Sequence, residues 1–365
     1  MNHRLTTLKS LETYSSDKTE IIDISVKDPM TALIFDLEVH NSAAGSMSYH
    51  PINCLKTVEL VDGSDVLFSL SGPELEALDW YNNKTFRSNY NYALADGYCC
   101  RFVGYQFGRY LYDPKYALDP TKFRNLQLKV TLDIDGGGLA PTYNKLQVWA
   151  MLFDGKAITP EGFLMSKEIR NYTLTASGHE YIDLPVDHPY RKLLIRQQTP
   201  GTEPNQLLAN IKLSEDQDKK VPFNHGTEDI LRSIMATHPQ VIESYFFALD
   251  TSNRYLMIAP TTRVTAFGSV WAAAAVAQDE AFYDGDGGRL KTIAAANPSN
   301  TQILVTGWLP HGVWAIPFGN QDDPDDWYDV TPLGNLKADI TAASGAASTD
   351  SCQIFVEQVR KYAAA

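Results

Sequence analysis

The sequence is poor in the features that mark secreted and membrane proteins. Of its 365 residues only four are cysteines, and they show neither CxxC spacing nor a disulfide framework: Cys54, Cys99, Cys100 and Cys352. Such cysteines are usually buried free thiols, which fits synthesis in a reducing compartment. The most apolar stretch, VWAAAAVA at 270–277, is far shorter than the roughly 18–20 residues of a membrane-spanning helix. The N-terminal stretch MNHRLTTLKSLETYSSDK lacks the apolar segment of a signal peptide, so nothing predicts secretion by that route.

Motifs of familiar catalytic sites are missing as well. The sequence contains no GxSxG, no GxxxxGK(S/T) and no GxGxxG placed between a strand and a helix, so the usual signals of hydrolases and nucleotide-binding proteins are absent. Its eight histidines form no HxH, HExxH or HxxxH pair that would indicate a zinc site: 3, 40, 50, 179, 188, 225, 238 and 311. A formal net charge of −13 argues against a surface that coats nucleic acid, and we expect no sequence-specific nucleic-acid binding.

What the sequence contains in abundance is β-strand pattern. Segments such as TALIFDLEV (31–39), LQLKVTLDI (126–134) and KLQVWAMLF (145–153) combine alternation with β-branched and aromatic residues. Turn signals such as VDGSD, DGGG and TPGTEPN separate the segments. Because helices are not regularly interposed, the pattern predicts antiparallel sandwiches or barrels rather than a βαβ fold.

Two helices interrupt the strand pattern. SGPELEALDWY (71–81) opens with Ser71 and has Glu74 three residues later, which is a capping box. GTEDILRSIMATH (226–238) has Thr227 and two acidic residues in its first turn, where the helix dipole favours negative charge.

The two helices belong to an internal duplication. Three pairs of segments match in the same order: 20–29 with 180–189, 58–78 with 211–231, and 107–126 with 318–336. The first pair reads EIIDISVKDP and EYIDLPVDHP, and in the third pair Phe-Gly, Asp-Pro and Asn-Leu recur in order. The offset between copies changes, as loop insertions and deletions require, and loops tolerate such growth because closure entropy rises slowly with length.

Each copy has room for about eight strands, the number in a jelly roll. We therefore predict an all-β chain of two tandem eight-stranded jelly-roll β-sandwiches, each with a short helix. The expected organisation is an N-terminal arm, a first jelly roll, a connector and a second jelly roll: 1–19, 20–155, 156–179 and 180–365. Long inserted loops are expected at about 245–305, and each of 20–29 and 180–189 is expected to lead into the first strand of its own jelly roll.

This organisation resembles a known family of viral coat proteins. The stretches DGSDVLFSLSGPELEALDWY, FGRYLYDPKYALDPTKFRNLQLKVTLDID and EGFLMSKEIRNYTLTASGHEYIDLPVDHPYR look like double jelly-roll major capsid proteins of tailless icosahedral bacteriophages with an internal membrane. The resemblance, together with the duplication, spans most of the chain.

The resemblance implies a structural protein that is not an enzyme and needs no cofactor. It implies a homotrimer of pseudo-hexagonal outline that assembles into the icosahedral shell of a virion, after synthesis in the host cytoplasm. Penton or minor capsid proteins would be further partners. The loops at about 245–305 would form an outer tower or wrap a neighbour. The arm 1–19 would lie on the inner side, as a disordered end, a clamp on a neighbour or a contact with an internal membrane.

The main alternative is a double-sandwich enzyme or binding module that acts on carbohydrate. An enzyme of this kind would need two carboxylates about 5–10 Å apart across a cleft. A binding module would use exposed aromatic side chains that stack on sugars, and six are candidates: Trp80, Tyr81, Trp308, Trp314, Trp327 and Tyr328. The oligomeric state separates these hypotheses, because a capsid protein requires a trimer whereas a glycosidase or lectin module can be monomeric.

Three acidic turns are the remaining candidate sites. DIDGGG (133–138), DGDGG (284–288) and DDPDD (322–326) place carboxylates beside flexible backbone, as calcium loops do, although none has the DxDxDG…E arrangement. Solvated turns are the favoured interpretation. The best candidates for a cation site are the four carboxylates of the last turn: Asp322, Asp323, Asp325 and Asp326.

Overall fold

The computed structural model describes residues 2–42, 47–87, 89–138, 142–154, 158–248, 254–271, 282–283, 285–292 and 300–362. Residues 272–281 and 293–299, which belong to the expected inserted loops, lie outside this set. Within the described residues, no helix is long and apolar enough to cross a membrane.

The first half of the chain is built from short strands around one helix. Its elements are β1 (His3–Tyr14), β2 (Lys18–Asp23), β3 (Met30–Asn41), η1 (Pro51–Cys54), β4 (Leu55–Asp62), β5 (Asp65–Leu70), α1 (Gly72–Asn83), β6 (Asn89–Ala93), β7 (Gly97–Gln106), η2 (Pro120–Lys122), β8 (Leu126–Leu132), η3 (Ile134–Gly137) and β9 (Asn144–Phe153).

The second half repeats this series and adds strands after its helix. Its elements are β10 (Gly162–Thr173), β11 (His179–Leu184), β12 (Tyr190–Gln197), α2 (Pro204–Leu207), β13 (Leu208–Glu215), β14 (Lys220–Gly226), α3 (Thr227–Thr237), β15 (Val241–Ala248), β16 (Arg254–Met257), β17 (Pro260–Trp271), β18 (Phe282–Tyr283), η4 (Asp286–Gly288), β19 (Arg289–Thr292), β20 (Asn300–Pro310), β21 (Val313–Pro317), η5 (Pro324–Asp326), β22 (Leu336–Ala342) and β23 (Ser351–Lys361).

The strand order of the sheets confirms the predicted duplication. In the first half the orders are β1-β9-β3-β7 and β2-β8-β4-β5, and in the second they are β10-β23-β12-β21 and β11-β22-β13-β14. Each strand of one series therefore has a counterpart at the same place in the other, and a helix follows β5 and β14 alike. The predicted fold of two eight-stranded jelly rolls is confirmed.

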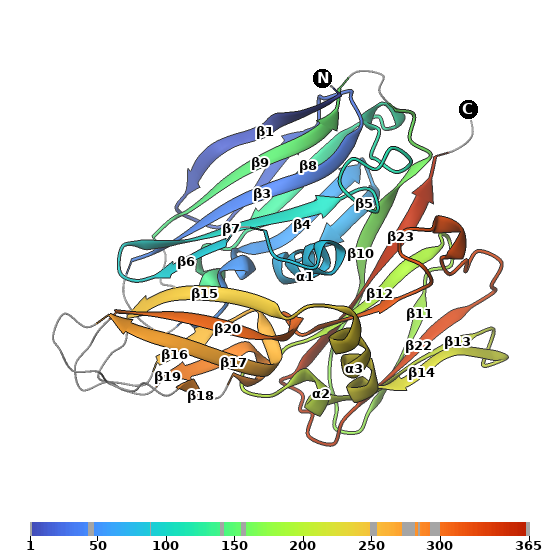
Figure 1. The fold of residues 1–365 in the computed structure, drawn as a ribbon. Helices are drawn as coiled ribbons and strands as arrows, with labels where there is room; N and C mark the ends of the chain where they lie inside the picture. Colours follow the sequence, from blue (N-terminus) through green and yellow to red (C-terminus); the bar gives the residue numbers. More distant parts are fainter. Residues whose placement is uncertain are drawn as a thin grey trace.

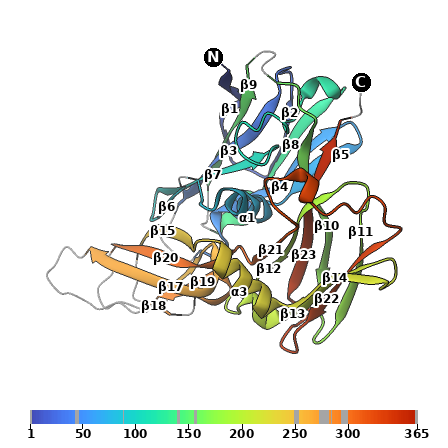
Figure 2. The same cartoon turned by 45° about the vertical axis from the view of Figure 1, so that its right-hand side comes forward.

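The two halves are joined edge to edge. β5 pairs in parallel with β10, and β6 pairs in parallel with β15. These contacts produce two eight-stranded sheets that each run through both halves. Helix α1 lies between the two groups of strands in both views (Figures 1 and 2), and most of its side chains are buried.

Two of the expected segments, the arm and the connector, contain strands. Residues 3–14, inside the expected arm 1–19, form β1, which pairs along β9. Residues 162–173, inside the expected connector 156–179, form β10, which pairs along β23. Both strands contain bulges that disturb the alternation from which strands are recognised. The repeated decapeptides consequently begin in the second strands of the two halves, β2 and β11.

Both predicted helices are confirmed. At the start of α1, a carboxylate oxygen of Glu74 accepts a hydrogen bond of 2.8 Å from the backbone amide of Ser71. The prediction of 226–238 corresponds to α3, whose first turn carries Glu228 and Asp229. The core between the sheets follows the alternation of the strands, as in β8, where Leu126, Leu128, Val130 and Leu132 are buried and the residues between them are half-buried.

Part of the expected loop segment 245–305 is regular structure. β15, β20 and β17 extend the first sheet beyond β6, and β16, β19 and β18 form a small sheet of their own. Figure 1 shows these strands grouped beyond β6, beside the second half.

Candidate functional site

The junction between the halves contains a buried network of charged and polar side chains. Arg101 of β7 is fully buried, and its guanidinium donates to one oxygen of Glu76 at 2.5 and 3.1 Å and to Glu243 at 2.6 Å. Glu76 comes from α1 and Glu243 from β15, so Arg101 ties the helix of the first half to a strand of the second. A buried cation with two carboxylates is stable only when its hydrogen bonds are satisfied, as they are here.

Two histidines complete this network. The Nε2 of His311 lies 2.8 Å from the second carboxylate oxygen of Glu76, and the Nε2 of His50 lies 3.2 Å from Glu243. Their rings meet edge to face with centroids 4.8 Å apart. His311 stands in the β20–β21 turn and His50 immediately before η1, so the network again joins residues of both halves.

The electrostatics of the network hold the carboxylates ionised. Burial alone would raise the pKa of Glu243, but the charge of Arg101 and the contact with His50 outweigh it and lower this pKa. The pKa of Glu76 is lowered in the same way by Arg101 and His311. Burial lowers the pKa of His311 to about 4, which keeps this imidazole neutral near pH 7.

Among the described residues, one group of three possible metal ligands has its ligand atoms within 4.8 Å of one another: His50, Glu76 and His311. The existing hydrogen bonds do not fit a metal ion. The Nδ1 of His50 accepts from the backbone amide of Ile52 at 3.3 Å, so its Nε2 carries the proton and donates to Glu243. A metal at that nitrogen would require both contacts to break. We therefore interpret the group as a hydrogen-bonded junction.

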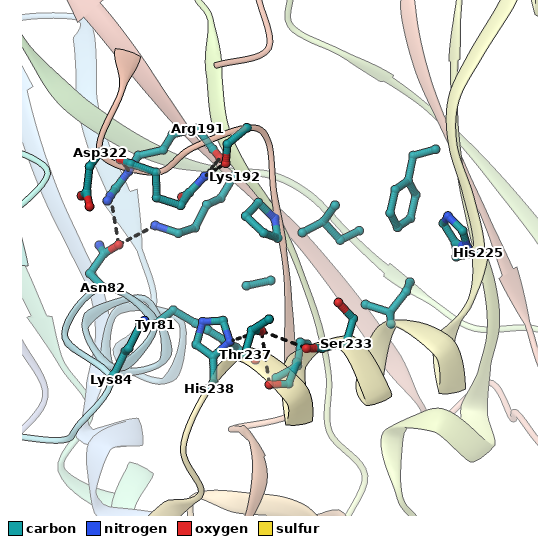
Figure 3. A pocket seen from close by; sticks show the side chains of 18 of the residues that line it. Tyr81, Asn82, Lys84, Arg191, Lys192, His225, Ser233, Thr237, His238 and Asp322 are labelled. Carbon is teal, nitrogen blue, oxygen red and sulfur yellow. Dashed lines mark hydrogen bonds between the residues drawn. The ribbon is translucent and has the colours of Figure 1, made fainter. Parts of the chain in front are cut away.

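A cavity of about 720 Å³ lies beside this junction, between α1, α3 and the β21 region. Figure 3 shows Asn82 of α1 facing Arg191 and Lys192 of β12 across one end of the cavity. The carboxamide oxygen of Asn82 accepts from Arg191 at 3.0 Å and also from Lys192. Glu357 of β23 accepts from both cations, at 3.0 and 2.8 Å. This second buried cluster also joins α1 to the second half.

Burial and neighbouring charges shift the pKa values of the charged groups in this second cluster. Desolvation, assisted by the neighbouring charge of Arg191, lowers the pKa of Lys192 to about 8 although Glu357 opposes the shift. Burial would raise the pKa of Glu357, but Arg191 and Lys192 lower it to about 2. Both cations are thus paired with Glu357, and through Asn82 the cluster links α1 to β12 and β23.

The four candidate cation ligands of the acidic loop lie around η5, and all four are exposed: Asp322, Asp323, Asp325 and Asp326. The carboxylate of Asp323 accepts from the Asp325 amide at 3.2 Å, and that of Asp326 accepts from the Asn320 amide at 2.6 Å. Two of the carboxylates thus cap turns of their own loop, and Asp322 lines the cavity. Nothing observed tests whether this loop binds a cation, so solvated turns stay the favoured interpretation.

The other two acidic turns also adopt local structure. Most of DIDGGG forms η3, and residues 286–288 of DGDGG form η4. Asp284 lies outside the described residues.

The residues that would support a carbohydrate site are mostly unavailable. Four of the six candidate aromatic side chains are buried: Trp80, Tyr81, Trp314 and Trp327. The closely placed carboxylates of Glu76 and Glu243 are buried as well and bind Arg101, so a glycan cannot reach them. Neither the enzyme nor the binding-module alternative is favoured.

Sequence reasoning missed the junction network entirely. His50, Glu76, Arg101, Glu243 and His311 are spread over more than half of the chain. No short motif contains two of them at a recognisable spacing. Only the rarity of fully buried charged residues could have drawn attention to them, and burial is not visible in one sequence.

No protein-family model and no curated protein matches this chain. Solved structures do match along nearly its whole length. A chain from the atomic structure of Sulfolobus Turreted Icosahedral Virus has a TM-score of 0.59 at 12% identity and covers 98% of this chain and 90% of its own. The major capsid protein P2 from bacteriophage PM2 gives 0.56 at 10% identity, with 99% and 98% covered. The PBCV-1 virus capsid gives 0.57 at 12% identity, with 98% and 94% covered.

These neighbours are double jelly-roll major capsid proteins, and the likeness to them establishes the fold of this chain as the double jelly roll. The resemblance predicted from the sequence is therefore confirmed at the level of the fold.

Proposed function

We propose that this chain is the major coat protein of an icosahedral virus and builds the shell of its virion. The single observation that carries the proposal is the match of both jelly rolls, over 98–99% of the chain, to capsid proteins of different viruses. A likeness confined to one sandwich would fit many unrelated β proteins. A likeness that includes both sandwiches and their pairing favours the coat function of the matched capsid proteins.

The mechanism that we propose is assembly without catalysis. Three chains with two similar halves each present six similar sides, so a homotrimer has a pseudo-hexagonal outline and packs into a near-hexagonal lattice. The buried networks at the junction keep the halves of each chain at a constant angle, which such a lattice requires. Penton and minor capsid proteins would complete the shell, and the host cytoplasm would be the place of synthesis.

For the domains we propose that the boundary between the two halves of the chain lies within 155–161. β1 then belongs to the first jelly roll and β10 to the second. The segment 1–19 is the one that we propose to face an internal membrane, and residues 3–14 of it pair with β9.

The test is the mass of the purified protein by light scattering after size exclusion. We expect a species near three times 40.6 kDa, or larger shell-like particles that electron microscopy would show directly. A clean monomer at micromolar concentration would contradict the proposal and redirect work to glycan binding and hydrolysis.

A further inference from the structure

The cavity between α1, α3 and the β21 region has a preformed apolar wall. Its volume of about 720 Å³ lies within the roughly 300–1,000 Å³ of small-molecule sites in proteins. Side chains of α3 and β21 that are nearly fully buried in the chain make up much of this wall: Ile230, Ile234, Ala315 and Ile316. The cavity therefore offers a fixed apolar surface to the body of a ligand.

One end of the cavity carries cations. Arg191 and Lys192 of β12 line it, and their side chains are only 3% and 4% exposed. Figure 3 shows both beside Asn82 at this end. A third cation of the wall, Arg109, is balanced by the carboxylate of Asp113, which it contacts at 2.7 and 2.9 Å. Cations withdrawn from water require an equal negative charge nearby, because they lose their hydration.

Among the described residues, one buried carboxylate serves both Arg191 and Lys192. The two cations donate to the same oxygen of Glu357, at 3.0 and 2.8 Å. Both also donate to the carboxamide oxygen of Asn82, whose nitrogen donates to the second oxygen of Glu357 at 3.2 Å. Because the carboxamide is neutral, two positive charges meet one negative charge. The cluster thus keeps an excess of one positive charge at the cavity.

The other acidic side chains of the wall do not remove this excess. Asp229 and Asp322 are both exposed, and the ion pairs of the two cations within the described residues are those with Glu357. The charge of Asp322 raises the pKa of Lys192 less than that of Glu357 does, and burial together with Arg191 still lowers this pKa to about 8. A lowered lysine pKa is what an incompletely compensated buried cation should show.

We propose that the cavity binds an amphipathic organic anion, with a carboxylate at Arg191 and Lys192 and an apolar body against α3 and β21. Charge complementarity selects the head group, because one carboxylate supplies the one missing negative charge. It can accept from the third N–H group of Lys192, since Glu357 and Asn82 use two. A doubly charged phosphate would reverse the imbalance, and a free inorganic anion would leave the apolar wall in contact with water. The inference does not depend on the proposed coat function.

Isothermal titration calorimetry with ligands of equal chain length tests the head group. We expect octanoate to bind once per chain at pH 7. Octanol should bind at least about ten-fold more weakly, because it cannot form a charge-assisted hydrogen bond with the cations. Octyltrimethylammonium, which carries the opposite charge, should show no measurable binding. The absence of octanoate binding, or equal affinities for octanoate and octanol, would overturn the inference.

A matched pair of variants tests the position of the ligand. Ser233 of α3 is exposed and lines the cavity, whereas Ala236 of the same helix is exposed but is not part of the wall. Both exposed positions should accept a phenylalanine without loss of folding. Ser233→Phe should lower the affinity for octanoate at least about ten-fold, because the ring and the ligand compete for one volume. Ala236→Phe should leave it unchanged, and equal affinities in the two variants would place the octanoate elsewhere and contradict the inference.

A third variant separates charge from shape. Lys192→Met leaves Arg191 and Glu357 as a balanced pair, so we expect this chain to fold. Its affinity for octanoate should fall to that for octanol, while its affinity for octanol should equal that of the wild-type protein. A preference for octanoate that persists in this variant would show that another group holds the carboxylate, against the inference. If the variant does not fold, the ligand series and the Ser233 and Ala236 variants still decide.

Discussion

At the scale of single residues, the junction depends on a few buried polar side chains. Arg101 is fully buried and neutralises carboxylates of α1 and β15 at once. A buried network of this kind adds little net stability compared with a well-packed apolar junction, but removal of one member leaves the others uncompensated. We therefore expect its main contribution to be specificity for one arrangement of the halves.

Replacement of the central cation should be costly. We expect Arg101→Met to lower the free energy of unfolding by about 3–5 kcal/mol, because Glu76 and Glu243 would remain buried without their counter-charge. Arg170→Met is the control, since Arg170 pairs with Glu180 at the surface and such pairs contribute at most about 1 kcal/mol. Equal effects in urea denaturation would contradict the assigned role of Arg101.

The neutral His311 should make stability depend on pH. Its pKa is lowered from 6.5 to about 4 in the folded chain, so between these values the unfolded chain binds a proton that the folded chain does not. The free energy of unfolding should therefore fall as the pH is lowered from 6.5 to 4, by at most about 3 kcal/mol from this residue. The pKa values of Glu76 and Glu243 are lowered from 4.5. Below about pH 4.5 the unfolded chain therefore binds protons at these carboxyl groups that the folded chain does not, and the free energy of unfolding falls further.

Denaturant titrations at several pH values would measure this dependence. His311→Gln should make the slope between pH 6.5 and 4 shallower. A slope that His311→Gln does not alter would show that the pH dependence arises elsewhere.

At the scale of elements, the β20–β21 turn positions His311. Leu309 and His311 have left-handed φ values of 53° and 51°, and Gly312 has φ 71°. A Cβ atom on Gly312 would lie 2.0 Å from the carbonyl oxygen of Gln197, so glycine is required there by contact as well as by conformation.

A pair of glycine substitutions separates these two requirements. Gly63, in the β4–β5 turn, has a similar φ of 62°, but a Cβ there meets nothing within 4 Å. We expect Gly63→Ala to cost about 1 kcal/mol from backbone strain alone. Gly312→Ala should cost at least twice as much by chemical denaturation, because β12 or the turn must also move. Equal losses of unfolding free energy in the two variants would mean that the turn around Gly312 can shift without a further cost.

At the scale of the whole molecule, the two halves of the duplication differ in how far their helices are buried. Ten of the twelve residues of α1 are buried, against four of the eleven residues of α3. Exposed apolar side chains such as Leu5 and Ile242 are then expected to be covered by assembly.

Assembly should couple stability to protein concentration. If the folded trimer dissociates as the chains unfold, Tm should rise with concentration, on the order of a few degrees for a hundred-fold increase. Differential scanning fluorimetry over that range would measure it. Leu5→Glu should flatten the dependence, whereas a wild-type Tm that is independent of concentration would argue against a folding-coupled trimer.

Local and repeated features were predictable from the sequence alone. The capping box at Ser71 and Glu74 depends on residues three apart, so α1 could be placed before the structure was known. The duplication was visible because two copies of one fold keep the same order of strands, turns and helix. The double jelly roll followed from these two observations and from the resemblance to capsid proteins.

The tertiary structure alone decided what depends on distant contacts. β1 and β10 are bulged strands whose pairing with β9 and β23 cannot be read from their own residues, so they were predicted as an arm and a connector. The Arg101 network brings together residues far apart in the chain, and no local sequence pattern predicts such contacts. The positions of β1 and β14 at the ends of their sheets, among the described strands, are likewise decided by the tertiary structure, because pairing is a property of the sheet and not of the single strand.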